Sequence, residues 1–481
     1  MAEASPKNYK KIAAESIANP VLQKSLAGLF NRLGRGAAAA YKALPEGPGL
    51  RHIAHDMRME AIANLDVLLE TLAANITKNG GKVFFAADAN AAVAHLIELA
   101  SKNNVKRVVK GKSMVTEEIG LNAAFQKAGI EVAETDLGEY IIQLADEHPS
   151  HIIAPAIHKT RYDIGRLFTD KLKIPYEEDP PTLTRAARKA LRTKFLTADM
   201  GISGCNLACA ETGHIAVVSN EGNIRMSSTL PRIHVAVMGM ERVTARLTDY
   251  DILLRLLTRG AAVQDITTYV SHIGGPRQKG QADGPDEFHL VIIDNGRSKI
   301  LADENFREML GCIRCAACLN VCPVYAKIGG HAYGSAYCGP LGAVVTPLLG
   351  GINQAADLCQ GETLCGACKD ACPVNIDLPR MLLELRAKLA DGDKRWNVKR
   401  ADHVFKALFG VWSFLVSHRP IYELMLRLAV TGQRLLPKKR GMLNRLPPPF
   451  NGWTQSRNLK PLARKSFNQG YRENRHNREK T

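Results

Sequence analysis

Apolar and polar positions alternate along residues 57–300 with two different periods. The spacing from Met57 to Asn79 predicts one amphipathic helix that ends at Gly80-Gly81. A short apolar run at residues 82–86 predicts a strand, and residues 90–100 return to the helical period. Further strands are predicted at residues 105–109, 130–133, 151–154, 215–218, 234–238 and 290–294. Strands that alternate with helices predict an α/β domain whose sheet is mainly parallel.

The pattern changes after residue 300, where loops and helices surround a group of cysteines. The 42 residues between Cys322 and Cys365 are too many for a compact hairpin, and residues 381–389 have the helical period. We therefore expect an all-α, helical ferredoxin-like domain. Residues 404–436 predict a further helical segment with a break at Pro420. The predicted parts are an N-terminal extension (1–56), the α/β domain (57–300), the ferredoxin-like domain (301–392), a C-terminal helical segment (393–436) and a basic tail (437–481).

The formal charge of +17 is concentrated at the C-terminus. From Gln433 onward the chain has thirteen Lys or Arg and two acids, a net +11, so the preceding residues hold only +6. Because aromatic residues are sparse in this tail, a solvated tail or one that docks onto an acidic partner is favoured over nucleic-acid binding. No uncharged stretch reaches the roughly 20 residues of a membrane span, and no signal peptide is visible at the N-terminus. A cytoplasmic protein is expected.

Seven of the eleven cysteines form two runs, each of which ends in Cys-Pro. The first run has the complete spacing of a bacterial ferredoxin, in which the fourth cysteine binds the neighbouring cluster. This crossing rule predicts two [4Fe–4S] clusters and a role in electron transfer. Cluster 1 would be held by Cys312, Cys315, Cys318 and Cys372, and cluster 2 by Cys322, Cys365 and Cys368. Structural zinc prefers separate cysteine pairs and fits poorly, and Cys205 and Cys209 are interpreted as small buried residues.

The second run lacks one ligand. A complete run would have cysteine three residues before Cys365, where this chain has Glu362. Cys359 could reach back over a turn at Gly361 and is the favoured fourth ligand, while Cys338 is a second candidate. A non-cysteine ligand, a water molecule or a three-iron cluster remain as alternatives.

The α/β domain has no nucleotide-binding motif. The Gly111-Lys112-Ser113 segment lacks the glycine that a phosphate loop requires at position 106, and no GxGxxG follows a strand. Polar residues instead gather in the predicted strand-end loops, which line the crevice of open α/β sheets. Lys112, His158 and Glu211 are the candidates to face a small carboxylate or a partner surface there.

Several segments together resemble the LUD domain: Lys112–Gly120, Glu134–Ile142, His151–Lys159, Ala210–Gly213 and Asn220–Asn223. Followed by the two cysteine runs, they resemble the lactate utilisation protein B family of LUD-domain iron–sulfur proteins over residues 57–460. The resemblance implies a fold related to ribose-5-phosphate isomerase and CoA-transferases. It also implies a three-protein system that oxidises L-lactate to pyruvate, with LutA-like and LutC-like partners and a further electron acceptor.

Two functions follow from these features. In the first, the chain is an electron-transfer subunit, non-catalytic or sharing catalysis within an L-lactate oxidoreductase complex. In the second, the α/β domain is a small-molecule-binding or transferase-like module whose clusters are structural or sense redox state. Reduction of the clusters by L-lactate in the presence of the partner proteins would distinguish the two.

Overall fold

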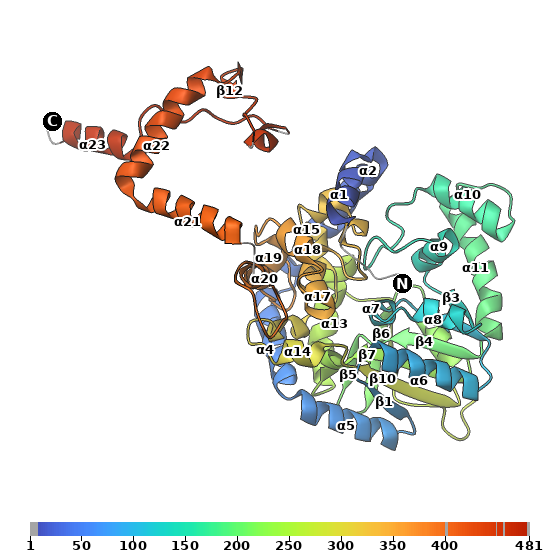
Figure 1. The fold of residues 1–481 in the computed structure, drawn as a ribbon. Helices are drawn as coiled ribbons and strands as arrows, with labels where there is room; N and C mark the ends of the chain where they lie inside the picture. The colour runs from blue at the N-terminus through green and yellow to red at the C-terminus, as the bar shows by residue number, and fades with distance from the viewer. Residues whose placement is uncertain (1–7, 400–402, 449, 456, 479–481) are drawn as a thin grey trace. The chain divides into compact units, whose positions relative to one another are not determined.

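The computed structural model describes residues 8–399, 403–448, 450–455 and 457–478. The chain divides into two compact units, Met1–Arg400 and Ala401–Thr481 (Figure 1). The first unit contains the α/β domain and the cysteine-rich region, and both predicted fold classes are confirmed there. Among the described residues, no helix has both the length and the apolar character needed to cross a bilayer.

The centre of the first unit is a six-stranded sheet with the order β1-β10-β7-β4-β2-β3, in which every pairing is parallel. Its strands are β1 (Lys82–Ala86), β2 (Arg107–Lys110), β3 (Glu131–Glu134), β4 (Met200–Gly204), β7 (Ile233–Gly239) and β10 (Glu287–Ile293). Parallel strands need crossover connections, which explains the helices between them.

Both faces of this sheet are buried, as is usual for parallel sheets. Alternate residues of β7 belong to different hydrophobic clusters: Val235 and Val237 to one, and Ala236 and Met238 to the other. The helices α6 (Ala89–Lys102) and α8 (Leu121–Lys127) cover the first face, as Figure 1 shows. The second face is covered by α5 (Leu65–Lys78) and α12 (Asn223–Thr229), and near β2 and β3 by α9 (Leu137–Ala145), α10 (Arg161–Leu172) and α11 (Pro180–Thr197).

A second sheet has four strands in the order β8-β5-β6-β9 and mixes parallel with antiparallel pairs. Its strands are β5 (Leu207–Cys209), β6 (His214–Ser219), β8 (Val243–Thr244) and β9 (Tyr269–Ile273). The predicted strand at 215–218 therefore forms, but in this sheet. The remaining elements of the α/β domain are α7 (Met114–Glu118), η3 (Met240–Arg242) and α13 (Thr248–Ala262).

Two predicted elements were wrong. The helix expected from Met57 to Asn79 is divided at Asn64 into α4 (Gly47–Ala63) and α5, because Asn64 leaves helical geometry at φ −119° and ψ 31°. The strand expected at 151–154 is a bend, followed by a turn at 155–158. In the bend, His151 Nδ1 accepts the backbone N–H groups of Ile153 and Ala154 at 2.9 and 3.0 Å, which bends the chain.

The cysteine-rich region is helical, with short elements between loops. It contains α14 (Arg297–Leu301), η4 (Arg307–Gly311), α15 (Ala317–Val321), α16 (Tyr325–Ile328), η5 (His331–Tyr333), α17 (Gly339–Gly350), α18 (Ala356–Gly361), α19 (Ala367–Asp370) and α20 (Leu378–Asp391). N-terminal helices pack on it: α1 (Tyr9–Ala18), α2 (Pro20–Leu29), η2 (Phe30–Gly34), α3 (Arg35–Lys42) and α4. Residues of these helices share one hydrophobic core with the cysteines.

The second unit begins with α21 (His403–Ser417) and α22 (Arg419–Gly432), so the break predicted near Pro420 is confirmed. It continues with η6 (Gln433–Leu435), the paired β11 (Lys438–Lys439) and β12 (Met442–Leu443), η7 (Phe450–Thr454) and α23 (Phe467–Arg478). Gln433 fixes the return of the chain, because its side chain exchanges two hydrogen bonds with the backbone of Leu462.

Candidate functional site

Four cysteines from the two sequence runs surround one small cavity. Its wall is completed by apolar residues such as Ile313, Leu341 and Val374, and the cysteines are Cys312, Cys315, Cys318 and Cys372. Cys372 thus lies with the first run and apart from Cys365 and Cys368, the other cysteines of its own run. This grouping corresponds to the one that the crossing rule predicts for cluster 1.

Backbone groups direct hydrogen bonds at these sulfurs. The N–H of Arg314 donates to Cys312 Sγ at 3.4 Å, and the N–H of Ile376 donates to Cys372 Sγ at 3.3 Å. From α4, Arg51 donates to the carbonyl of Cys372 at 2.6 and 2.9 Å, which fixes the Cys-Pro turn. Burial raises the pKa of the Cys372 thiol to about 12, so a bound cation is needed to hold it as a thiolate at neutral pH.

The remaining cysteines of the two runs surround a second cavity. Cys322, Cys365 and Cys368 line it together with Glu362. The N–H of Tyr325 donates to Cys322 Sγ at 3.4 Å, as in the first cavity. Cys365 is exposed, so this second cavity lies nearer to solvent than the first, whose cysteines are mostly buried.

The other two cysteines considered as ligands lie elsewhere. Cys359 is fully buried on α18, and Cys338 is buried at the start of α17. Neither belongs to the described residues that line the second cavity. Among the residues that line the second cavity with the three cysteines, Glu362 supplies a carboxylate.

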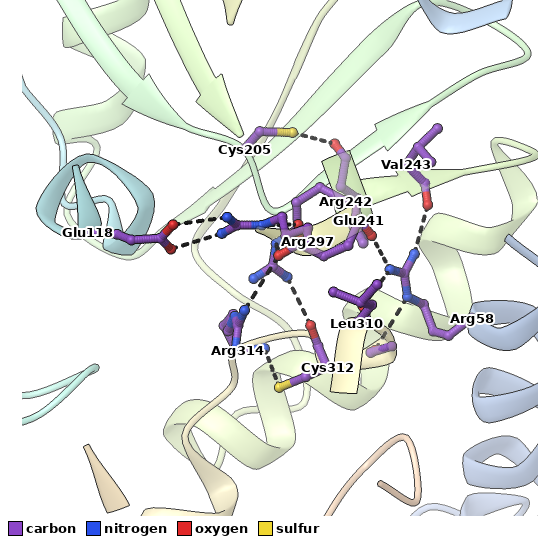
Figure 2. A network of polar contacts seen from close by, with 12 residues as sticks. Arg58, Glu118, Cys205, Glu241, Arg242, Val243, Arg297, Leu310, Cys312 and Arg314 are labelled. Atoms are coloured by element: carbon purple, nitrogen blue, oxygen red, sulfur yellow. Dashed lines mark hydrogen bonds and ion pairs between the residues drawn. The ribbon is translucent and has the colours of Figure 1, made fainter. Parts of the chain in front are cut away.

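A buried network of arginines lies beside the first cavity (Figure 2). Its centre is the Glu241 carboxylate, which is fully buried and accepts from Arg297 Nε at 2.7 Å, with Arg314 Nη2 at 3.5 Å. Arg297 also forms a bidentate pair with Glu118 at 2.8 and 2.9 Å. On the other side, Arg58 of α4 donates to the carbonyls of Glu241 and Val243.

The network carries more positive than negative charge. The network comprises four guanidinium groups and two carboxylates, those of Arg58, Arg242, Arg297, Arg314, Glu118 and Glu241. These six side chains have a net charge of +2, and the Asp249 carboxylate also interacts electrostatically with Arg58. The guanidinium groups lower the pKa of Glu241 to about 2 in spite of its burial. Arg242 donates to the carbonyl of Cys312 at 3.3 Å, so the surplus charge is adjacent to the first cavity.

The chemistry of both cysteine groups fits an iron–sulfur cubane. Among the described residues, no His, Cys, Asp and Glu side chains converge in the way a single metal ion requires. A cubane binds each cysteine at a separate iron, so its ligands surround a cavity, and N–H groups that point at sulfur are its usual support. The positive network would also offset part of the negative charge of four thiolates.

A third cavity, of about 310 Å³, lies at the carboxyl edge of the parallel sheet. Residues that follow β2, β3, β4 and β7 contribute to it, including Lys112, Asp136, Asn206 and Arg242. Arg314, two residues after Cys312, lines it as well. Ile313 lines both this cavity and the first cysteine cavity, so the two adjoin at the start of the first cysteine run.

Only one of the three predicted crevice residues reaches this cavity. Lys112 lines it and pairs with Glu139. His158 instead contacts Glu147 at 2.8 Å, and Glu211 accepts the backbone N–H of Leu247 at 3.0 Å. The sequence analysis missed Arg242 and Arg314, because no local spacing relates residues 242 and 314 to the cysteines.

The fold and the site define a class of protein, an α/β LUD domain joined to an iron–sulfur region. The LUD domain family matches residues 69–293, and the 4Fe-4S dicluster domain family matches residues 308–376.

Curated relatives cover nearly the whole chain. Lactate utilization protein B of Bacillus subtilis is 42% identical over 459 residues, which is 95% of this chain and 94% of the relative. The protein of the same name from Bacillus licheniformis is equally similar over the same shares. The relative named "uncharacterized electron transport protein YkgF", from Escherichia coli, is 46% identical over 384 residues, 80% of this chain and 81% of its own length. The chain belongs to the lactate utilisation protein B family.

Proposed function

We propose that this chain is an electron-transfer protein of lactate utilisation that carries two [4Fe–4S] clusters. The observation that carries the proposal is the crossed grouping of the cysteines, with Cys372 in the first cavity and Cys322 in the second. This grouping brings two one-electron centres close together, which suits a relay. The names of the Bacillus relatives and of YkgF support lactate and electron transport as its context.

In this proposal, Cys312, Cys315, Cys318 and Cys372 hold cluster 1, and Cys322, Cys365 and Cys368 hold three corners of cluster 2. When bound, the clusters supply reversible one-electron transfer. The chain's own groups tune it: N–H donors at Cys312, Cys322 and Cys372 and the net positive arginine network both favour the reduced state.

The positions of the two cavities support a direction for the relay. Cluster 1 would lie beside the 310 Å³ cavity, whose wall includes Lys112, Arg242 and Arg314. These cations suit an anionic donor such as a small carboxylate. Cluster 2 would lie near solvent at Cys365, where a partner can approach. Electrons would then enter at the first cluster and leave at the second.

We infer that the chain works in the cytoplasm within a multi-protein L-lactate oxidation system that produces pyruvate, with LutA-like and LutC-like partners. Helix α21 provides support for the proposal of protein partners, because it exposes several large apolar side chains. More than half of the surface is exposed at each of Leu408, Val411, Trp412 and Phe414. Exposed apolar groups of this density mark interaction sites. In this arrangement the chain is a non-catalytic or shared-catalysis subunit of an L-lactate oxidoreductase.

The cavity also favours a second candidate function. An α/β module that binds a small molecule would use the same Lys112, Arg242 and Arg314 wall, with clusters that are structural or sense redox state. The two functions differ in one observable. The relay requires that L-lactate reduces the clusters when the partners are present, whereas the binding module requires only that the ligand binds.

The test starts from protein purified without oxygen, in which we expect about eight irons and eight sulfides per chain. L-Lactate is then added together with the LutA-like and LutC-like proteins, and cluster reduction is followed by electron paramagnetic resonance. Reduction is expected in the complete mixture. Zinc in place of iron, or clusters that stay oxidised in the complete mixture, would contradict the proposal.

A pair of variants tests the entry point. Lys112→Ala should slow the reduction of the clusters by lactate, because Lys112 lines the 310 Å³ cavity. The iron content should stay normal, because Lys112 is not among the residues that line either cysteine cavity. Lys102→Ala, at an exposed lysine on α6, is the matched control and should behave like the wild type. Reduction of Lys112→Ala at the normal rate would remove the cavity from the electron path.

A further inference from the structure

Glu362 occupies the position at which the second cysteine run lacks a ligand. It lies three residues before Cys365, and its side chain lines the cavity with Cys322, Cys365 and Cys368. Glu362 Oε2 is 3.2 Å from Cys322 Sγ. The sequence position and the cavity wall are two independent observations, and both select the same residue.

The surroundings of Glu362 hold its carboxylate in place. The Tyr333 hydroxyl donates to Oε1 at 2.7 Å, which leaves Oε2 directed at the sulfur. Arg386 of α20 donates to the Glu362 carbonyl at 2.7 Å and fixes the backbone. The residue is only 7% exposed. A buried carboxylate is costly unless it is paired or coordinates a metal, and no Lys, Arg or His side chain forms an ion pair with it among the described residues.

The cysteine that could compete for this position is held away from the cavity. Cys359 lies within helix α18. Its N–H donates to the carbonyl of Ala355, and its own carbonyl accepts a hydrogen bond from Arg386 Nε at 2.8 Å. Cys359 is not among the described residues that line the cavity, whereas Glu362 lines it directly.

We propose that Glu362 is the fourth ligand of cluster 2, so that this cluster is bound by three cysteines and one carboxylate. The inference rests on the proposed two-cluster cofactor content and refines it. On assembly, the Cys322 thiol releases its proton to solvent, as cysteine ligands must, and Glu362 changes from hydrogen-bond acceptor to iron ligand through Oε2. Tyr333 is a positioning residue, because it acts on iron only through the carboxylate.

A carboxylate ligand makes one corner of cluster 2 different from the others. Oxygen is a harder ligand than thiolate and binds iron of a sulfide cluster less strongly. The iron at Glu362 should therefore be the first to leave under mild oxidation, which converts cluster 2 into a three-iron cluster, while cluster 1 remains intact. Proximity of this corner to exposed Cys365 gives oxidants access to it.

The test compares four variants of the anaerobic, full-length protein: Glu362→Gln, Glu362→Cys, Tyr333→Phe and Cys359→Ala. Iron content and the three-iron signal in electron paramagnetic resonance are measured before and after limited ferricyanide. Wild type should lose about one of eight irons and gain the signal. Glu362→Cys should resist this loss, because it completes a run of four cysteines. Glu362→Gln should show the three-iron signal before oxidation, and Tyr333→Phe should lose iron faster than wild type.

Cys359→Ala is the matched control and should match wild type in every measurement. The reverse pattern, a three-iron signal in Cys359→Ala with normal behaviour of both Glu362 variants, would overturn the inference and select Cys359. The cluster 1 signal reports folding in each variant. Wild type with four irons or with zinc would instead contradict the cofactor proposal itself, so the two failures are distinguishable.

Discussion

Replacement of Glu241 by glutamine tests the buried arginine network. The carboxylate is fully buried and interacts with Arg297 and Arg314, with Arg242 3.9 Å away (Figure 2). Glutamine keeps the volume and one oxygen but removes the charge. The net charge of the network would then rise from +2 to +3, with Glu118 as the only remaining carboxylate.

Two routes give the expected loss of stability. Breaking a buried ion pair by removing one partner costs about 3–5 kcal/mol. The depressed pKa of Glu241, about 2 instead of 4.5, corresponds to about 3 kcal/mol of favourable interaction with the charged form. We therefore expect Glu241→Gln to lower the free energy of unfolding by about 3 kcal/mol. For an m value of roughly 3 kcal/mol per M, the urea midpoint should fall by about 1 M.

The pH dependence has a definite sign. Because the pKa of Glu241 is lower in the folded than in the unfolded chain, its contribution is fully present above pH 4.5 and is lost as the pH falls toward 2. Urea unfolding of the anaerobic protein, followed by circular dichroism at several pH values, measures both quantities. The variant should show a smaller loss of stability than wild type across this acid range.

Glu98→Gln is the control, since Glu98 forms an exposed i,i+4 pair with Lys102 on α6. Its effect on the urea midpoint should be small beside that of Glu241→Gln, because exposed ion pairs contribute little to stability. If Glu241→Gln is as stable as Glu98→Gln at neutral pH, the network does not stabilise the fold, and the reasoning from burial and charge is refuted.

Three further predictions concern other parts of the molecule. Cys372→Ser should remove the signal of the cluster held by Cys312, Cys315 and Cys318 and leave that of the cluster at Cys365, as measured by electron paramagnetic resonance; selective loss of the other cluster would reverse the assignment. Arg51→Met should speed the loss of iron from the same cluster to a chelator, because its hydrogen bonds to the Cys372 carbonyl, each worth about 1.5–3 kcal/mol, are removed; an unchanged rate would show that the Cys-Pro turn is held without it. Burial and the neighbouring Glu139 raise the pKa of Glu117 to about 8. At this group the folded chain therefore binds more protons than the unfolded chain between pH 4.5 and 8, so the stability that Glu117 contributes falls as the pH rises through this range. Glu117→Gln should flatten this part of the stability curve in urea unfolding, and a slope equal to that of wild type would contradict the assignment.

The sequence predicts the parallel sheet best where strands are continuous and apolar. The segments 82–86, 234–238 and 290–294 correspond to β1, β7 and β10. Strand β4 was missed because Met200–Gly204 contains two glycines and has no clear apolar period. Gly201 is needed there, since a Cβ would lie 1.7 Å from the carbonyl oxygen of Ser227 on α12. The close packing of α12 on β4 therefore requires glycine at position 201, and glycine weakens the apolar pattern by which a strand is predicted.

The same limit applies to the site. Spacing within a run identifies the cysteines, because most of the cysteines around each cavity come from a single run and only Cys372 and Cys322 cross over. The spacing of the second run also identifies residue 362 as the position where a cysteine is missing. Because the residue there is a glutamate, the cysteine pattern alone did not predict it as a ligand. The arginine network has no comparable signal. Its members lie between residues 58 and 314, and only the fold brings them to Glu241.

The arginine network links the α/β domain with the cysteine-rich region, because its members come from both. Arg242 comes from the segment after β7, Arg297 from α14 and Arg314 from the first cysteine run, while Arg58 comes from α4. The four arginines thus come from both the α/β domain and the cysteine-rich region, together with helix α4. The electrostatic potential at Cys312 therefore depends on how the α/β domain holds Glu241 and Arg242. Arg242 also lines the 310 Å³ cavity. An anion bound in this cavity would therefore partly neutralise the positive charge near the first cysteine group, and it would lower the reduction potential of a cluster held there.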